Sequence, residues 1–184
     1  MSASLPTFQT TNLLIREIGF QDINDMYDYA KLPFVGPMAG WEPHLNKNET
    51  RMVIQSFHNK KKFGQIGVFS VVLKETNKMI GTIELHSYVR LHKAELGYTI
   101  HPDFWGKGYA VEASKVLIRW GFLHLQLKRI ECNTFMDNPQ SIRVVEKLGF
   151  EFEGIKRNGY ILPDGKIKDL RMYSLTNTQY FETL

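Results

Sequence analysis

The sequence predicts an α/β protein with a single domain over residues 1–184, in which helices flank a mixed, mostly antiparallel central sheet. Three observations support this class. The chain has 184 residues, of which 43% are hydrophobic, and this is enough to bury one sizeable core. Two apolar stretches around a polar turn indicate a hairpin in the middle of the chain. A long segment with apolar residues at helical spacing follows soon after.

The first third of the chain predicts one strand and two helices, with a loop between the helices. Residues 13–18 form an apolar strand pattern, and residues 22–31 carry apolar side chains on one helical face. Three prolines and two glycines then argue against regular structure over residues 33–43. A second helix is expected at 48–62, where three lysines suit the negative end of the helix dipole.

Three antiparallel strands and a helix are expected in the middle of the chain. Residues 66–73 and 79–88 form the hairpin, with a turn at 75–78, and residues 93–100 add a third strand. Alanine, leucine and tryptophan then recur at helical spacing over residues 108–125.

The last third predicts a strand, a helix and a second hairpin. A short strand at 129–134 precedes Asn138, which is a good N-cap because a proline follows it at the first helical position. Gly149 fits the end of this helix. Two strands at 152–162 and 167–176 surround a Pro-Asp-Gly turn and complete the chain.

Composition argues against several classes of protein. Cys132 is the only cysteine, and the six histidines lack the spacing of a metal site, so we expect no metal. A net charge of +4 attracts anions, but no basic stripe with interleaved aromatics indicates direct nucleic-acid binding. No secretory signal pattern and no apolar run of membrane-spanning length is present, so we expect a cytoplasmic protein without membrane association.

The stretch WGKGYA, residues 105–110, connects the third strand of the middle group to the long helix. Gly106 and Gly108 leave backbone N–H groups open at the positive end of a helix dipole, which favours an anion site. A dinucleotide fingerprint would need glycine or alanine where Val111 stands, and the chain has no Walker A pattern. On this pattern alone, a tight turn without a ligand explains the glycines at least as well.

Two longer motifs resemble a known family. GYTIHPDFWGKGYAVEA, followed later by NPQSIRVVEKLGFEFEG, is similar to the paired signature of the GNAT superfamily of acetyl-CoA-dependent N-acetyltransferases. TTNLLIRE, the Trp41-Glu42-Pro43 loop and AELGY resemble its Rim-type branch, which acetylates ribosomal-protein alanine or serine N-termini. The pyrophosphate loop of the superfamily begins with Gln or Arg, whereas this chain has Trp105, as is usual in that branch. The resemblance covers nearly the whole chain and implies a single-domain GNAT fold.

The resemblance implies acetyl-CoA as cosubstrate, held largely by main-chain groups. In GNAT enzymes the glycine loop binds the pyrophosphate, and the strand before it pairs with the pantetheine arm. Asn138 and Ser141 match the NxxS motif of the branch, which lies beside the cofactor and its sulfur, although Asn138 also suits an N-cap. The cofactor-binding set is therefore Tyr98, Thr99, Ile100, Trp105, Gly106, Lys107, Gly108, Tyr109, Ala110, Val111, Asn133, Asn138 and Ser141.

Acetyl transfer to nitrogen requires a neutral amine and a departing thiolate. A free thiol has a pKa of about 8.5, so the thiolate leaves readily and positioning contributes more than proton transfer. The candidate bases are Glu84 and Glu95 on neighbouring strands, with Glu84 slightly favoured by position, and Ser141 is the candidate acid. Because strand residues alternate between faces, a surface position explains either carboxylate equally well. His101 and Tyr109 are weaker candidates.

The predicted function is transfer of the acetyl group to a protein N-terminal α-amine. The alternatives are a small-molecule amine such as a polyamine, amino acid or antibiotic, and a non-catalytic acyl-CoA sensor. Cys132 lacks a basic neighbour in the sequence, so we expect a packed thiol and direct attack in a ternary complex. Monomer and homodimer are both open. Candidate acceptor contacts, for which burial under the loop is an equal alternative, are Phe34, Trp41, His44 and Tyr160.

Overall fold

The structure, a computed structural model that describes residues 4–183, contains one sheet with the strand order β1-β2-β3-β4-β5-β6-β8-β7. Neighbouring strands are antiparallel except β5 and β6, which are parallel. The mixed, mostly antiparallel sheet is therefore confirmed. Its strands are β1 (Phe8–Gln9), β2 (Leu13–Glu17), β3 (Val68–Leu73), β4 (Lys78–Val89), β5 (Lys93–Ile100), β6 (Arg129–Phe135), β7 (Glu151–Ile161) and β8 (Ile167–Thr176).

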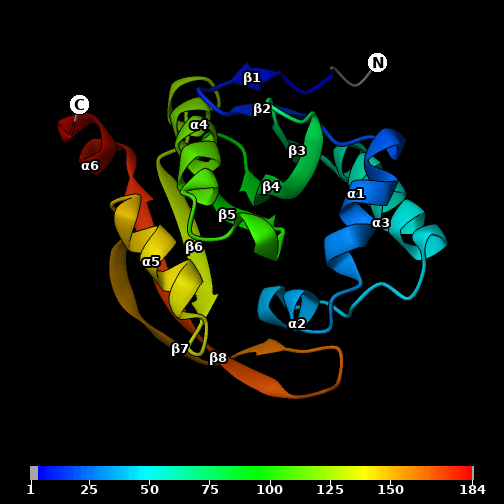
Figure 1. The fold of residues 1–184 in the computed structure, drawn as a ribbon. Coiled ribbons are helices and arrows are strands. Elements are labelled where there is room, and N and C mark those ends of the chain that lie inside the picture. The colour runs from blue at the N-terminus through cyan, green and yellow to red at the C-terminus, as the bar shows by residue number, and fades with distance from the viewer. Residues whose placement is uncertain (1–3, 184) are drawn as a thin grey trace.

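Helices cover both faces of the sheet. Figure 1 shows α4 and α5 on one face, and α1 and α3 grouped on the other. The helices are α1 (Ile23–Ala30), α2 (Val35–Ala39), α3 (Lys47–Asn59), α4 (Tyr109–Leu123), α5 (Pro139–Lys147) and α6 (Asn177–Glu182). Three short 3-10 segments, η1 (Phe20–Asp22), η2 (Lys60–Phe63) and η3 (Pro102–Phe104), join them to their neighbours. None of the helices within residues 4–183 has the length and apolar character needed to cross a bilayer.

The core lies on both faces of β3, whose six residues are all buried. Phe69 packs under α4, where its ring centroid lies 5.8 Å from that of Trp120. Val68 and Val72 alternate to the other face and join the cluster that contains Ile54 of α3. Each fully buried side chain of this size stabilises the fold by about 1.5–3 kcal/mol, so these two layers fix the helices against the sheet.

The loop expected at residues 33–43 contains a helix instead. Residues 35–39 form α2, with Pro37 in its first turn. A proline is tolerated there because the N–H groups of a first helical turn have no intrahelical partner. Gly40, with φ of +89°, ends the helix in the left-handed conformation. The expectation of irregular structure was therefore wrong for this segment.

The parallel pairing between β5 and β6 is short, and this shapes the functional site. The two strands pair only from Lys93 to Glu95 on β5 and from Arg129 to Glu131 on β6. Beyond these residues β6 continues along β8 as far as Phe135, while β5 continues along β4. The sheet therefore separates between β5 and β6, and within residues 4–183 the main-chain groups on the facing edges beyond Glu95 and Glu131 have no strand partner.

Candidate functional site

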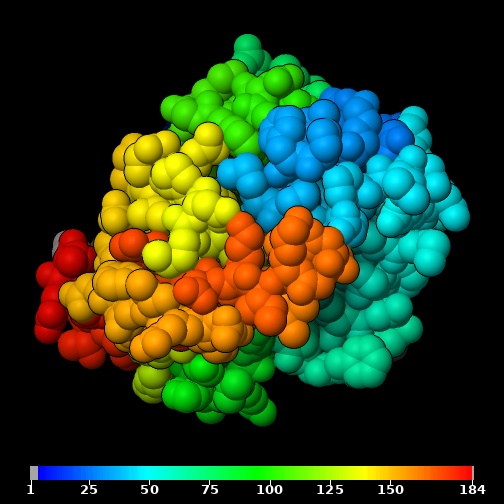
Figure 2. Space-filling model, turned by 90° about the horizontal axis from the view of Figure 1, so that it is seen from below, coloured from blue at the N-terminus to red at the C-terminus, as the bar shows by residue number. Residues whose placement is uncertain are grey.

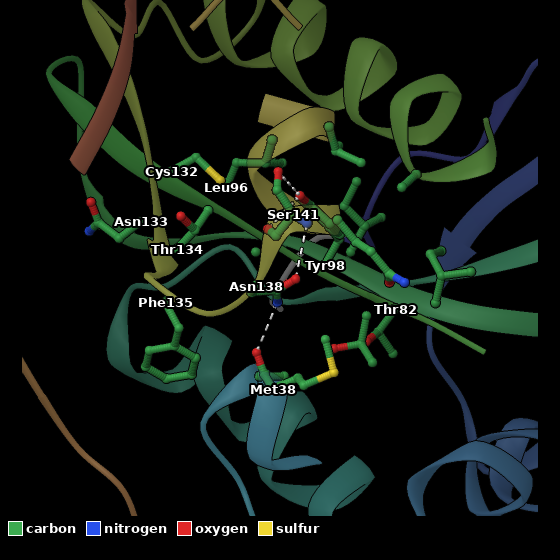
Figure 3. Close-up of a pocket in the computed structure, with 18 of the residues that line it drawn as sticks. Met38, Thr82, Leu96, Tyr98, Cys132, Asn133, Thr134, Phe135, Asn138 and Ser141 are labelled. Carbon is green, nitrogen blue, oxygen red and sulfur yellow. Dashed lines mark hydrogen bonds between the residues drawn. The ribbon is translucent and has the colours of Figure 1, made fainter. Parts of the chain in front are cut away.

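A cavity of about 580 Å³ lies where β5 and β6 separate. Its walls come mainly from β4, β5, β6, α2, the loop before α4 and the helices α4 and α5, with single residues from α3, β7 and β8. Figure 3 shows this cavity, with side chains from β5, β6, α2 and α5 arranged around it. The site thus combines segments from nearly the whole length of the chain.

The glycine loop forms one end of the cavity. Gly106 and Gly108 have φ of +73° and +84°, and a Cβ atom built on either would meet nothing within 4 Å. The left-handed backbone conformation, rather than close packing, therefore favours glycine at both positions. The first helical bond is from Glu112 N–H to the Gly108 carbonyl, at 2.9 Å. The N–H groups of the preceding residues consequently point out of the helix start, where the dipole favours an anion.

Trp105 and Lys107 use their side chains outside this anion site. The indole Nε1 of Trp105 donates a hydrogen bond of 2.6 Å to the Ile100 carbonyl, so its side chain ties the loop to the end of β5. Lys107 does not line the cavity, and its Nζ lies 5.1 Å from the ring centroid of Phe104. The cavity end is therefore formed mainly by the backbone.

Three polar side chains meet at the cavity wall between β5 and α5. Asn138 Oδ1 accepts a hydrogen bond of 3.1 Å from Ser141 N–H, which confirms the predicted N-cap. Its Nδ2 donates to the carbonyl of Met38 on α2, at 3.3 Å. The Tyr98 hydroxyl lies 2.9 Å from Ser141 Oγ, and Figure 3 shows these contacts as dashed lines. Burial raises the pKa of Tyr98 well above its ordinary value.

The two predicted carboxylates lie on one face of the sheet, away from α4. Glu84 pairs with Gly97, and His86 pairs with Glu95, so all four residues share this face. A Cβ atom at Gly97 would lie 3.2 Å from His86 Nε2, so the glycine leaves space between these side chains. Glu84 forms an ion pair with Lys60 of η2. Among residues 4–183, Glu95 has neither an ion-pair nor a hydrogen-bond partner.

Trp41 and Tyr160 also line the cavity. The Tyr160 hydroxyl donates a hydrogen bond of 2.9 Å to the Gly40 carbonyl, which connects the β7–β8 hairpin to the end of α2. In Figure 2 the hairpin, in orange, lies directly against the light-blue segment that contains α2. Two chain segments far apart in sequence therefore close this side of the cavity.

Two predicted acceptor contacts lie outside the cavity walls. His44 is 6% exposed, and its Nδ1 lies 2.9 Å from Thr50 Oγ1, so it packs inside the protein as a hydrogen-bonded core residue. Phe34 is 46% exposed, and its ring contacts that of Trp105 at a centroid distance of 6.1 Å. The sequence pattern did not distinguish these residues from Trp41, which does line the cavity.

The remaining predicted residues all contribute to the cavity wall. They are Glu84, Glu95, Tyr98, Thr99, Ile100, Trp105, Gly106, Gly108, Tyr109, Ala110, Val111, Asn133, Asn138, Ser141, Trp41 and Tyr160. The structure brings these residues together from elements that are far apart in the sequence.

Several wall residues carry no signal in the sequence. Thr134 is 3% exposed, and its Oγ1 has no hydrogen-bond partner within residues 4–183. A threonine in a strand is so common that nothing marks this one. Cys132 also lines the cavity, and burial raises the pKa of its thiol, so the thiol stays protonated. Arg143 and Lys147 also line the cavity, and their i,i+4 spacing on α5 places them on one face of that helix.

A family model, a curated relative and a solved structure that resemble this chain are all acetyltransferases. A family model described as an acetyltransferase (GNAT) domain matches residues 12–151. The uncharacterized N-acetyltransferase p20 of Bacillus licheniformis is 32% identical over 177 residues, which are 96% of this chain and 99% of that protein. A crystal structure of a GNAT-family acetyltransferase from Bacillus anthracis has a TM-score of 0.83 at 26% identity and covers 94% of this chain and 99% of its own.

Relatives with named acceptors differ from one another. The [ribosomal protein uS5]-alanine N-acetyltransferase of Escherichia coli (strain K12) is 31% identical over 144 residues, 77% of this chain and 69% of that protein. The spermidine N(1)-acetyltransferase of the same organism is 35% identical over 75 residues, 40% of each chain. The relatives therefore agree on the transferred group and disagree on the acceptor.

Proposed function

We propose, on the premise that this chain belongs to the GNAT family of acetyltransferases, that it transfers the acetyl group of acetyl-CoA to the α-amine of a protein N-terminus. One observation carries the proposal: a single cavity joins the glycine loop at one end to the face with Glu84 and Glu95. An anionic donor and an amine acceptor can therefore meet inside it. The longer match to the ribosomal-protein enzyme supports a protein N-terminus as acceptor.

The cofactor end fits a diphosphate followed by an extended arm. The N–H groups of residues 106–111 would hold the pyrophosphate, because Gly106 and Gly108 leave open space above them. The free edge of β5 at residues 97–100 would pair with the two amides of the pantetheine arm, as an added strand does. When bound, acetyl-CoA supplies the acetyl group as a thioester, which is the reactive bond of the reaction.

The chemistry requires one bond to form and one to break. The amine nitrogen bonds to the acetyl carbon, the carbon–sulfur bond breaks, and its electron pair leaves on sulfur. A proton from the nitrogen passes to a carboxylate, directly or through a water, and we assign this role to Glu95. Glu84 is already bound to Lys60, whereas Glu95 has no such partner within residues 4–183. An α-amine, with a pKa of about 8, needs less help from a base than a lysine amine, at about 10.4.

Direct attack is supported by the state of the cysteine. Cys132 is buried, and its raised pKa keeps the thiol protonated, so it is a poor nucleophile. Rapid-quench experiments should therefore show no burst of acetyl-enzyme before steady-state turnover. A burst that disappears in Cys132→Ala would contradict direct attack.

The acceptor is tested by a turnover assay with acetyl-CoA. The panel contains peptides with N-terminal alanine or serine, the same peptides with a blocked N-terminus and an internal lysine, polyamines, amino acids and aminoglycosides. We expect the highest kcat/KM for the free N-termini and loss of activity when they are blocked. Turnover of no amine, together with tight CoA binding, would favour a sensor over an enzyme.

A polyamine is the second candidate acceptor. Glu95 lines the cavity and has no ion-pair partner within residues 4–183, so it offers a carboxylate that suits a cationic amine. The shorter match to the spermidine enzyme points the same way. In the same panel, a higher kcat/KM for spermidine than for any peptide would establish this candidate instead of the first.

The cofactor end is tested by Gly108→Val. The side chain would enter the space proposed for the diphosphate, so we expect loss of acetyl-CoA binding in calorimetry. Gly64→Val is the matched control, because Gly64 has a similar φ of +74°, has nothing within 4 Å of its Cβ position, and lies outside the cavity. Both variants carry similar backbone strain, so only the first should lose binding. Unchanged binding in Gly108→Val would overturn the assignment of this end.

A further inference from the structure

His101 lies between the end of β5 and the glycine loop, and its side chain packs inside the protein, outside the cavity walls. It is 5% exposed, and its ring contacts those of Tyr29 and Phe104, at centroid distances of 6.2 and 5.6 Å. Its backbone N–H donates a hydrogen bond of 2.7 Å to the Ile80 carbonyl on β4. A buried imidazole has two polar ring nitrogens, and each needs a hydrogen-bond partner.

The partners of the two ring nitrogens fix the position of the ring proton. Nδ1 accepts a hydrogen bond of 3.1 Å from the backbone N–H of Asp103, whose carboxylate is farther away, at 3.9 Å. A backbone N–H can only donate, so Nδ1 carries no proton, and the proton of the neutral ring is on Nε2. Nε2 lies 3.3 Å from Oδ2 of Asp28 on α1 and donates to it. His101 is therefore a neutral imidazole in one tautomer, and its unprotonated nitrogen is already in use.

Asp28 favours this tautomer from the neighbouring helix. Its carboxylate also forms ion pairs with Lys78 on β4 and Lys31 on α1, at 3.2 Å each. The hydrogen bond from Lys78, together with those from Lys31 and His101, lowers the pKa of Asp28 to about 2, so the carboxylate is charged at neutral pH. A carboxylate that accepts from one ring nitrogen of a histidine holds the proton on that nitrogen and leaves the other free to accept.

The hydrogen bond from Asp103 caps the 3-10 segment η3, which leads directly into the glycine loop. His101 is the N-cap of η3, and the N–H of Trp105 closes the segment by donating to the Pro102 carbonyl, at 3.0 Å. Gly106 follows immediately. Because a capping acceptor stabilises one conformation of the turn that follows it, His101 determines how the chain enters the loop. The indole bond from Trp105 to β5 is a second constraint on the same entry.

We propose that His101 is a positioning residue for the cofactor, because it holds the turn that presents the glycine-loop N–H groups to the pyrophosphate. The inference rests on the proposed function, since the pyrophosphate is that of acetyl-CoA. His101 lies outside the cavity, so it acts through the backbone rather than by contact. The cap restricts the conformations of the turn before binding, and less conformational entropy is then lost when the diphosphate binds.

The tautomer is measured directly in the free protein. Nitrogen-15 NMR distinguishes a protonated from an unprotonated ring nitrogen, and the His101 signals are identified as those missing from His101→Asn. We expect an unprotonated Nδ1 and a protonated Nε2 at neutral pH. A protonated Nδ1 would overturn the proposal, because such a nitrogen cannot accept from the Asp103 N–H.

Two variants of His101 separate the cap from the rest of the side chain. Asparagine and leucine have similar shapes, but only asparagine has an oxygen that can accept from the backbone N–H two residues on. In calorimetry we expect His101→Leu to raise the Kd for CoA about tenfold, as for a lost N-cap, and His101→Asn to stay within about twofold of the parent. In turnover assays, His101→Leu should raise KM for acetyl-CoA and leave kcat unchanged, because the turn lies away from the reacting atoms.

His58→Leu is the matched control. The Nε2 of His58 also bonds a backbone group, the Ile18 carbonyl at 2.7 Å, and this histidine lies outside the cavity. Its loss removes an imidazole and a hydrogen bond to the backbone at a place remote from the glycine loop. The Kd for CoA should therefore equal that of the parent.

Three binding results would overturn the proposal. They are a folded His101→Leu that binds CoA as the parent does, a folded His101→Asn that binds as weakly as His101→Leu, and an equal loss of affinity in His58→Leu. If His101→Leu does not fold, a loss of CoA binding in a folded His101→Asn still contradicts the proposal. Failure of the proposed function has a different signature, because the parent itself would then bind no CoA.

Discussion

Asn138 accepts a hydrogen bond from the N–H of Ser141 and donates one to the carbonyl of Met38, so one amide serves two elements. The first bond starts α5, and the second connects α5 to α2 across the cavity. The sequence predicted the hydrogen bond that starts α5, because an asparagine before proline is a frequent N-cap. The hydrogen bond to Met38 could not be predicted from the sequence, because the helix α2 was not expected there.

Glu95 and Glu84 offer a comparison at the residue scale. We expect Glu95→Gln to lower kcat by about 100-fold, which is typical for loss of a general base. Glu84→Gln should affect turnover less, because its carboxylate is occupied by Lys60. The measurement is kcat as a function of pH with the best acceptor of the panel. An equal or larger loss in Glu84→Gln would return the role of base to Glu84, the carboxylate that sequence position favoured.

Thr134 supplies a second prediction at this scale. Its buried hydroxyl lacks a partner within residues 4–183, and such a group destabilises the fold by about 1–3 kcal/mol relative to an apolar group of the same shape. Thr134→Val should therefore unfold at a higher denaturant concentration than the parent. If the hydroxyl binds the cofactor, the same variant should bind CoA less tightly. A variant with lower stability would show that the hydroxyl has a partner in the free protein.

Some site residues can be identified from a local sequence motif, and others only from the pairing of strands in the sheet. Gly106, Gly108, Asn138 and Ser141 occur in a fixed motif, and the structure places them all at the cavity. His86 and Thr134 reach the cavity only through strand register, which no local pattern encodes. His44 illustrates the opposite error, since a polar residue in an aromatic loop proved to be part of the core.

At the scale of elements, the strands and long helices agree well with the sequence pattern, and the short elements do not. β1 has only two residues, too few for any periodicity. α6 was missed, although Thr176 and Gln179 form a capping box whose spacing was visible in the sequence. β5 and β6 separate because β5 stays paired with β4 while β6 stays paired with β8. This pairing depends on contacts across the whole sheet, which no local sequence pattern shows.

Asp22 joins three elements and supports a prediction on pH. Its carboxylate accepts hydrogen bonds from Arg16 on β2, the N–H of Gly19 and Ser70 on β3. Burial alone would raise the pKa of Asp22, but these donors outweigh it and lower the pKa below its ordinary value. The resulting stability is present above the pKa of the unfolded carboxyl and is lost as the pH falls through the folded pKa.

Asp22→Asn should therefore lower the free energy of unfolding at neutral pH, by about 2–4 kcal/mol, because it leaves Arg16 without its partner. The difference from the parent should shrink below about pH 4, where the carboxyl of the unfolded parent takes up a proton while the folded carboxyl, with its lowered pKa, is still ionised. Urea denaturation at several pH values measures both effects. Glu75→Gln, at an exposed turn, should change neither. A difference that is constant with pH would show that the charge of Asp22 does not matter.

At the scale of the whole molecule, the sheet depends on one short parallel pairing to join its two parts. We expect CoA to protect the backbone amides of residues 96–100 and 132–135 in hydrogen exchange, because these edges are unpaired in the free protein. At about 100 times its Kd, CoA should add about 2.7 kcal/mol to the free energy of unfolding. Peptides from β3 should show no comparable change at short exchange times. Protection confined to other regions would place the cofactor elsewhere.

The unpaired edges of β5 and β6 also bear on how this protein can vary over evolutionary time. A main-chain N–H or carbonyl is present whichever side chain a residue carries, so most substitutions along these edges leave the binding groups in place. Selection then acts there mainly on backbone shape and on the few positions that must stay small. The p20 relative, at 32% identity, differs from this chain at most positions of the matched region. The acceptor side, which consists of side chains, has no such protection and is free to diverge.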